Sequence, residues 1–148
     1  MNARRLTFIV LLFSWIGDIR AECAGPLILE DSFAYNGTVF VGRAIAQEIV
    51  SRTGARDGTW ATETTFEVEE LWKGQTNTTL RVQNCGWHDG NEAMTCSEDF
   101  TFVVGFRYVV FAAGDPLQTN SCGPTALVDR AAKTLQWLFD KPRKSPVK

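Results

Sequence analysis

The first 21 residues have the three parts of a secretory signal peptide, and four cysteines follow them in the rest of the chain. Two arginines form a positive start, residues 6–16 form an apolar run, and Ala21 ends a small-residue cleavage motif. The apolar run is shorter than the roughly 20 residues that a membrane-spanning helix needs. We therefore expect residues 1–21 to be removed, leaving a secreted chain that starts near Glu22 and does not enter a membrane.

Export would place the cysteines in an oxidising compartment, where they are expected to form two disulfides. Four cysteines allow three pairings, which the sequence alone does not separate. We favour Cys23 with Cys122 and Cys85 with Cys96, because the second pair closes a short loop, residues 86–95, that is rich in turn-forming residues. In the chain-entropy model the long closure contributes roughly 4 to 5 kcal/mol and the short one about 3 kcal/mol.

A metal site is the alternative use of these cysteines. It would combine Cys85, His88 and Cys96, but His88 is the only histidine and the paired spacings of zinc sites are missing. We therefore expect the chain to hold no metal and no cofactor of its own.

The remaining residues of the 148-residue chain suffice for one domain, which we place at residues 22–140. The formal net charge of the whole chain is −2 and becomes more negative when the arginines of the signal are removed. Nucleic-acid binding depends on Lys and Arg that neutralise phosphates, so nucleic acid is not an expected partner. Residues 141–148 form a basic tail, which we expect to be solvated, the alternative being contact with an acidic surface such as matrix polysaccharide.

Alternation of apolar and polar residues predicts β-strands over most of the domain. The predicted strands cover residues 38–50, 60–72, 79–83 and 107–112, and Phe100 and Phe102 begin a further alternating segment. The strand at 107–112 is apolar throughout, which is typical of a central strand covered on both faces. In the second strand the alternation breaks at Glu70 and Leu71, which predicts a bulge or the end of the strand.

Two segments have helical patterns, residues 28–35 and residues 125–139. In the second, Thr125 is the predicted N-cap, and apolar residues including Leu127 and Leu138 lie on one face. The strands and helices together predict a mainly β fold. We expect a five-stranded, OB-fold-like Greek-key β-barrel with a short N-terminal helix and a C-terminal helix, braced by disulfides.

Four motifs resemble those of a known family in both order and spacing. They are VFVGR at 39–43, FEV with LWKG at 66–74, GFRYVVF at 105–111, and the segment 117–122. Over roughly residues 23–132 the chain resembles the netrin-like domains related to tissue inhibitors of metalloproteinases. This resemblance implies an OB-type barrel held by cystines.

The resemblance also implies a mechanism. In the inhibitors of this family, the first cysteine of the mature chain chelates the catalytic zinc of a metalloproteinase through its α-amino group and its carbonyl. That role would fall to Cys23, held in place by Cys122, with Ala24, Gly25 and Pro26 entering the protease cleft behind it. A mature terminus at Glu22 would move the amine by about 3.5 Å and abolish the chelation.

The alternative is an interaction module that binds extracellular matrix or a receptor without inhibiting a protease. Trp87, beside His88 in the predicted cystine loop, is the candidate contact residue, since tryptophan concentrates binding energy at interfaces. Packing of Trp87 over the end of the barrel is the structural alternative. In either case we expect a monomer with an extracellular protein partner.

An enzyme is the third class. Without nucleophile or phosphate-binding motifs, catalysis would depend on Glu67, Glu69 and Glu70, which fit better as the solvated face of a strand. We therefore expect no enzymatic activity.

Asn36 and Asn77 each begin an N-glycosylation acceptor motif in a predicted turn. Asn77 is the better candidate in a eukaryotic host, because Asn36 precedes Gly37 in a segment that is itself expected to make the turn.

Overall fold

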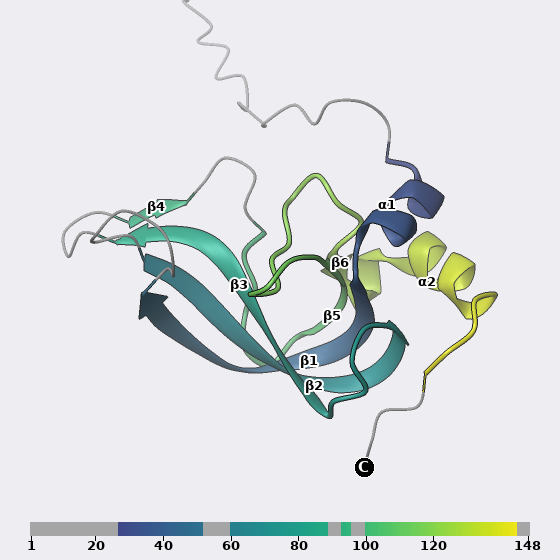
Figure 1. Cartoon of the computed structure of the whole chain (residues 1–148), viewed down its shortest axis with the longest axis horizontal. Coiled ribbons are helices and arrows are strands. Elements are labelled where there is room, and N and C mark those ends of the chain that lie inside the picture. The colour runs from purple at the N-terminus through teal and green to yellow at the C-terminus, as the bar shows by residue number, and fades with distance from the viewer. Residues whose placement is uncertain (1–26, 52–59, 89–92, 96–99, 145–148) are drawn as a thin grey trace, which may run out of the picture.

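The computed structural model describes residues 27–51, 60–88, 93–95 and 100–144. The fold is mainly β, as predicted, with one antiparallel sheet and two α-helices in the described part of the chain (Figure 1). The elements are α1 (Leu29–Tyr35), β1 (Thr38–Ser51), β2 (Trp60–Lys73), β3 (Thr79–His88), β4 (Ala93–Thr95), β5 (Arg107–Ala112), β6 (Ala126–Leu127), a 3-10 turn η1 (Val128–Arg130) and α2 (Ala132–Phe139). The strand order is β4-β3-β2-β1-β5-β6. None of the helices in these ranges is long and apolar enough to cross a bilayer.

The long strands β1 and β2 pair along their full lengths and bend strongly (Figure 1). Their register shifts at three places, which leaves Glu69 and Trp72 as extra residues on β2 and Ile45 as an extra residue on β1. The predicted break at Glu70 and Leu71 is thus confirmed as two bulges that flank these residues. Each bulge bends its strand and increases the local twist, which curls the sheet around its core.

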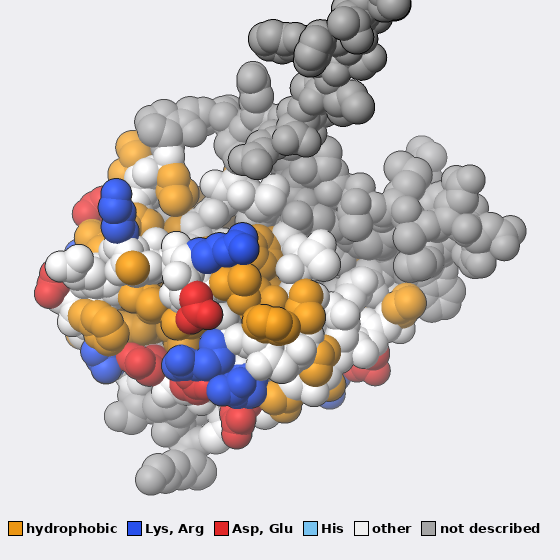
Figure 2. All heavy atoms as spheres, turned by 180° about the vertical axis from the view of Figure 1, so that it is seen from behind, with side chains coloured by type: hydrophobic (Ala, Val, Ile, Leu, Met, Phe, Trp, Pro, Cys, Tyr) orange, Lys and Arg blue, Asp and Glu red, His pale blue; other side chains and the backbone are white. Residues whose placement is uncertain are grey.

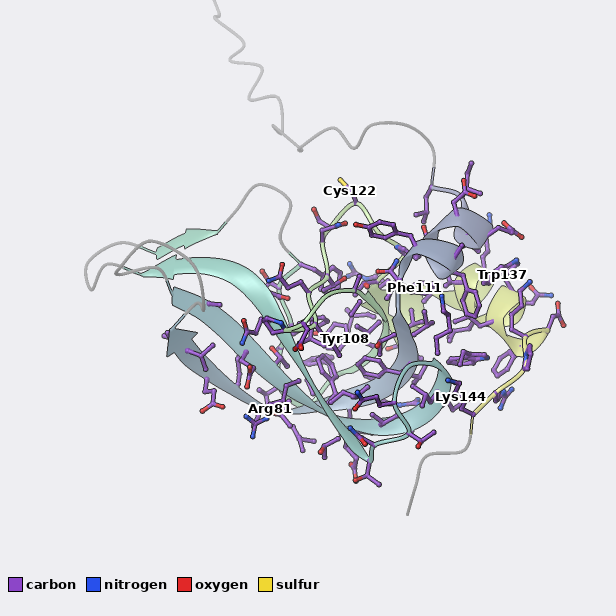
Figure 3. The ribbon with its side chains drawn as sticks, in the orientation of Figure 1. Arg81, Tyr108, Phe111, Cys122, Trp137 and Lys144 are labelled. Atoms are coloured by element: carbon purple, nitrogen blue, oxygen red, sulfur yellow. The ribbon has the colours of Figure 1, made fainter. Side chains whose placement is uncertain are left out.

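The central strand β5 is buried on both faces, as its sequence predicted. Tyr108 and Val110 belong to a cluster inside the curled sheet, together with Phe40, Phe66 and Phe102. Val109 and Phe111 point to the opposite face, where α2 covers them with Leu138. Tyr108 and Phe111 are labelled in Figure 3. A continuous apolar strand therefore separates two cores.

Phe100 and Phe102 are not in a strand, contrary to the prediction. Their rings fill the inner core from a loop, and the Phe102 ring centroid lies 4.8 Å from that of Phe66. Side-chain amides take the place of a strand partner, since Asn84 donates to the Phe100 carbonyl and Gln47 donates to the Phe102 carbonyl. The alternation in this segment reflects core packing alone.

The predicted helix at 125–139 begins only at Ala132, after β6 and the 3-10 turn. Thr125 is not an N-cap. Its buried hydroxyl accepts a hydrogen bond from the Phe111 backbone N–H at 2.9 Å and lies 2.8 Å from the Thr119 hydroxyl. The hydroxyl therefore bonds to residues outside the predicted helix, and residues 126–127 pair with β5 instead of starting a helix.

A contact between β3 and the chain after β5 joins distant parts of the sheet. Residues Ala113 and Gln118 pair across a tight turn, and the Gln83 N–H donates to the Leu117 carbonyl at 2.8 Å. Gln83 and Gln118 thereby form a parallel bridge. The turn at 114–117 therefore lies against one edge of β3.

The first half of the predicted basic tail is packed on the domain. Lys141 lies 4.4 Å from the Trp137 ring centroid, and Arg143 lies over Phe139 and pairs with Glu70 at 2.9 Å. The Lys144 N–H donates to the Leu71 carbonyl at 2.7 Å. Residues 142–144 are exposed, while cation-π and main-chain contacts hold residues 141–144 against the domain.

Candidate functional site

The segment predicted to reach a protease, Cys23, Ala24, Gly25 and Pro26, lies outside the described residues. The described chain starts directly after it, at Leu27 and Ile28, whose side chains are about half exposed at 52% and 49%. These two residues lead into α1. The attachment of α1 to the domain therefore fixes the base of the predicted binding segment.

Side chains of α2 and β2 attach α1 to the domain. Phe33 packs edge-to-face against Trp137 of α2, with ring centroids 5.5 Å apart. The Trp137 Nε1–H donates to Glu30 at 2.7 Å, and Lys73 Nζ donates to the Phe33 carbonyl at 2.6 Å while lying over its ring. The helix has no fully buried residue, so these contacts position it.

The carboxylate of Glu30 gives this attachment a pH dependence. Its own backbone hydrogen bond, and then the bond from Trp137, lower the pKa of Glu30 below the ordinary value of 4.5. Because the pKa is lower in the folded state, ionised Glu30 favours docking of α1 above about pH 4.5, and this contribution is lost as the pH falls through the folded value. We expect the Trp137 indole N–H resonance to shift in this acidic range in the wild type.

The Glu30→Gln variant is the matched control, because it keeps the size of the side chain and removes its titration. Its indole N–H resonance should stay constant over the same pH range. An identical titration in both proteins would show that another group controls the environment of Trp137.

Cys122 lies near the tip of the loop between β5 and β6, as labelled in Figure 3. Its sulfur is disulfide-bonded. Cys23 and Cys96 lie outside the described residues, and Cys85 is in β3 with its side chain outside the description. The pairing of Cys122 with Cys23 therefore stays a prediction.

Trp87 and His88 lie on a strand instead of in the predicted loop. Strand β3 continues to His88, and Trp87 pairs with Met94 of β4. The prediction ended the strand at Gln83 because the turn-forming residues that follow Cys85 have a loop composition. The orientation of the Trp87 side chain is outside the description, so its role as a contact residue stays a prediction. Of the other tryptophans, Trp72 is buried and Trp137 is half-buried.

The three glutamates considered for catalysis lie on the outside of β2, and two of them form ion pairs. Glu69 accepts hydrogen bonds from Arg107, with Nε to Oε2 at 2.8 Å, and these bonds raise the pKa of Arg107. Glu70 pairs with Arg143, and Glu67 is exposed. Among the described side chains no group of three His, Cys, Asp or Glu could hold a metal ion.

The two glycosylation candidates differ in their surroundings. Asn36 is half-buried, and its amide donates to the Ser32 carbonyl at 2.8 Å, at the end of α1. Asn77 is exposed in the turn between β2 and β3. The geometry therefore favours Asn77 as the residue that could carry a glycan.

A group of exposed apolar side chains lies where β1 meets the chain before β5. Ile45, Val103, Val104 and Phe106 are each about half exposed, and Ala44 and Phe106 are joined by a backbone hydrogen bond. We call these four residues the apolar patch. Figure 2 shows hydrophobic side chains gathered beside Arg, Lys, Asp and Glu on the back of the molecule. Ile45 is exposed because it is the extra residue of the β1 bulge.

A cleft of about 500 Å³ was not predicted from the sequence. It lies between β3 and the turn at 114–117, and Thr38, Gln75, Leu80 and Arg81 are among its lining residues. Glu63 also lines the cleft and is only 8% exposed. Its carboxylate lies 3.2 Å from Arg81 Nη1 and accepts a hydrogen bond from Gln83 Nε2 at 2.8 Å.

No protein-family model matches this chain, and a search of curated proteins found no match either. The family resemblance therefore depends on the residues quoted above.

Proposed function

We propose that this chain is a secreted, disulfide-braced netrin-like domain that binds an extracellular protein and catalyses no reaction. The observation that carries the proposal is the bridge between Gln83 and Gln118. The bridge joins β3 to the short segment that follows β5, and an approach of the chain after β5 to β3 is what an OB-type, partly open Greek-key barrel would require. Together with the strand order β3-β2-β1-β5, this bridge supports a closed or partly open barrel of that type.

The cysteines support the same proposal. Cys122 is disulfide-bonded, as expected for an exported protein. Cys85 directly precedes Gly86 in the sequence, and Cys96 directly follows Thr95, the residue that pairs with Gly86. This register favours the predicted link between Cys85 and Cys96.

Inhibition of a zinc metalloproteinase is the second candidate. It is favoured by the placement of Cys23 only a few residues before the anchored helix α1, which would hold the terminus as a preorganised segment. It requires Cys23 to be the first residue of the mature chain.

The experiment is N-terminal sequencing of the exported protein combined with inhibition assays on a panel of zinc endopeptidases. The binding-module proposal predicts a terminus at Glu22 and no inhibition. A terminus at Cys23, with inhibition that is lost on acetylation of the α-amino group, would replace it by the inhibitor function. A protein that keeps residues 1–21, or that has only free thiols, would contradict both.

A further inference from the structure

The cleft beside β3 contains a strand edge with unused main-chain groups. Its walls are residues 80–81 of β3 and residues 114–117 of the turn, and Gly37, Thr38, Gly74 and Gln75 are also among its lining residues. The volume of about 500 Å³ falls within the range of typical ligand pockets. The nature of this edge determines what the cleft can bind.

The hydrogen-bonding direction of each β3 residue follows from one backbone hydrogen bond and the register of the β2–β3 pair. The Val68 N–H donates to the Thr78 carbonyl, so Thr78 points its main-chain groups toward β2. In an antiparallel pair the direction alternates along the strand, and the register continues without a shift to Cys85. Thr79, Arg81 and Gln83 therefore point their N–H and C=O groups away from β2, toward the cleft side.

This outer edge already accepts an extended segment at one point. The Gln83 N–H donates to the Leu117 carbonyl, and the segment runs parallel to β3 there. The outward main-chain groups of Arg81 and Thr79, two and four residues before Gln83, have no partner among the described residues. The edge is thus continuous with an existing strand contact, but its first half opens into the cleft.

We propose that an extended peptide segment of a protein partner adds to this edge as a short strand, bonded to the main chain of Arg81 and Thr79. Addition of a strand to an exposed edge obtains its affinity from main-chain hydrogen bonds and its specificity from the side chains beside it. This inference depends on the proposed function, because it states how the domain would hold its protein partner.

The charges in the cleft define the peptide. Glu63 and Arg81 pair with each other, so the carboxylate of Asp115, which is exposed on the opposite wall, is the charge left without a partner among the described residues. A segment with a Lys or Arg side chain directed at Asp115 is therefore complementary to the site. Arg81 is labelled in Figure 3.

The test is a selection of short linear peptides from a displayed library for binding to the whole secreted chain. The Arg81→Pro variant is used for counter-selection. In the main chain, proline at this position removes an outward N–H and leaves the hydrogen bonds of the β2–β3 ladder in place, while the side-chain pair with Glu63 is lost in this variant and in its control alike. We expect Arg81→Pro to weaken the selected peptides by about tenfold or more, as the loss of one to two main-chain hydrogen bonds would do. The Arg81→Ala variant, which keeps the N–H, is the matched control and should lose much less.

A second measurement does not depend on the folding of a variant. Methylation of single backbone nitrogens in the selected peptide should abolish binding at alternate positions only, because alternate residues of an added strand face β3. In the wild type, the amide resonances of residues 79–81, Asp115 and Leu117 should shift on binding. Asp115→Asn should weaken the peptides that contain Lys or Arg.

Three results would overturn the inference. They are a failure to enrich any peptide, affinity that is insensitive to N-methylation, and peptide-induced shifts confined to the apolar patch. The last result would leave the domain as a protein-binding module with its contact surface elsewhere, whereas failure of the proposed function itself would be seen in the sequencing and thiol analysis of the exported chain.

Discussion

The Phe66→Ala variant is expected to lower the free energy of unfolding by about 3 to 5 kcal/mol, the usual cost of removing a large aromatic ring from a core. Phe66 is fully buried, and its ring packs edge-to-face with Phe40, Phe102 and Tyr108 at centroid distances of 5.4, 4.8 and 6.2 Å. Its removal leaves a cavity where β1, β2, β5 and the loop before β5 meet. Equilibrium denaturation in urea measures the change.

Phe106→Ala is the matched control for this variant. The same side chain is removed, but Phe106 is 53% exposed and holds β1 through its backbone carbonyl. Its cost should stay within about 1 kcal/mol, as for most surface substitutions. Equal losses in the two variants would contradict the placement of the inner core.

The Cys122→Ser variant is expected to lower the free energy of unfolding by about 2 to 5 kcal/mol, the typical cost of losing a native disulfide in a small secreted domain. Cys122 is disulfide-bonded, so the substitution also releases its partner sulfur. If the partner is Cys23, alkylation of the variant should label Cys23 and leave Cys85 and Cys96 unlabelled.

Ser121→Ala, which changes an exposed neighbour in the same loop, is the control for this experiment. It should leave both stability and alkylation unchanged. Unaltered thermal stability of Cys122→Ser, or labelling of Cys85 in its place, would contradict the predicted pairing.

The sequence predicts best those strands in which burial of one or both faces sets the order of apolar and polar residues along the strand itself. Residues 38–51, 60–73 and 107–112 are strands because alternating or continuous apolar side chains must be buried on one or both faces. The bulges beside Glu70 were detectable for the same reason, since a bulge reverses the alternation.

The predictions are wrong where a side chain makes a hydrogen bond to a residue far away in the sequence. Thr125 has the character of an N-cap, but its hydroxyl is used by Phe111 and Thr119. Phe102 has the alternation of a strand residue, but amide side chains replace the strand partner. Local sequence patterns contain no information on which long-range hydrogen bond competes with a cap or a ladder.

The same limit applies to the candidate sites. The cleft exists because Leu117 reaches Gln83, a contact between segments far apart in the sequence, and no motif marks it. Glu63 could be placed on the outer parity of β2, but its burial depends on the third strand and the turn that meet over it.

Disulfide mapping by mass spectrometry of the exported protein, without reduction, tests the central claim most directly. The account predicts a mature chain that starts at Glu22, contains no free thiol and yields two linked peptide pairs, Cys23 with Cys122 and Cys85 with Cys96. A chain that retains residues 1–21, or that carries reduced cysteines after export, would contradict the extracellular, disulfide-braced domain and the binding role proposed for it.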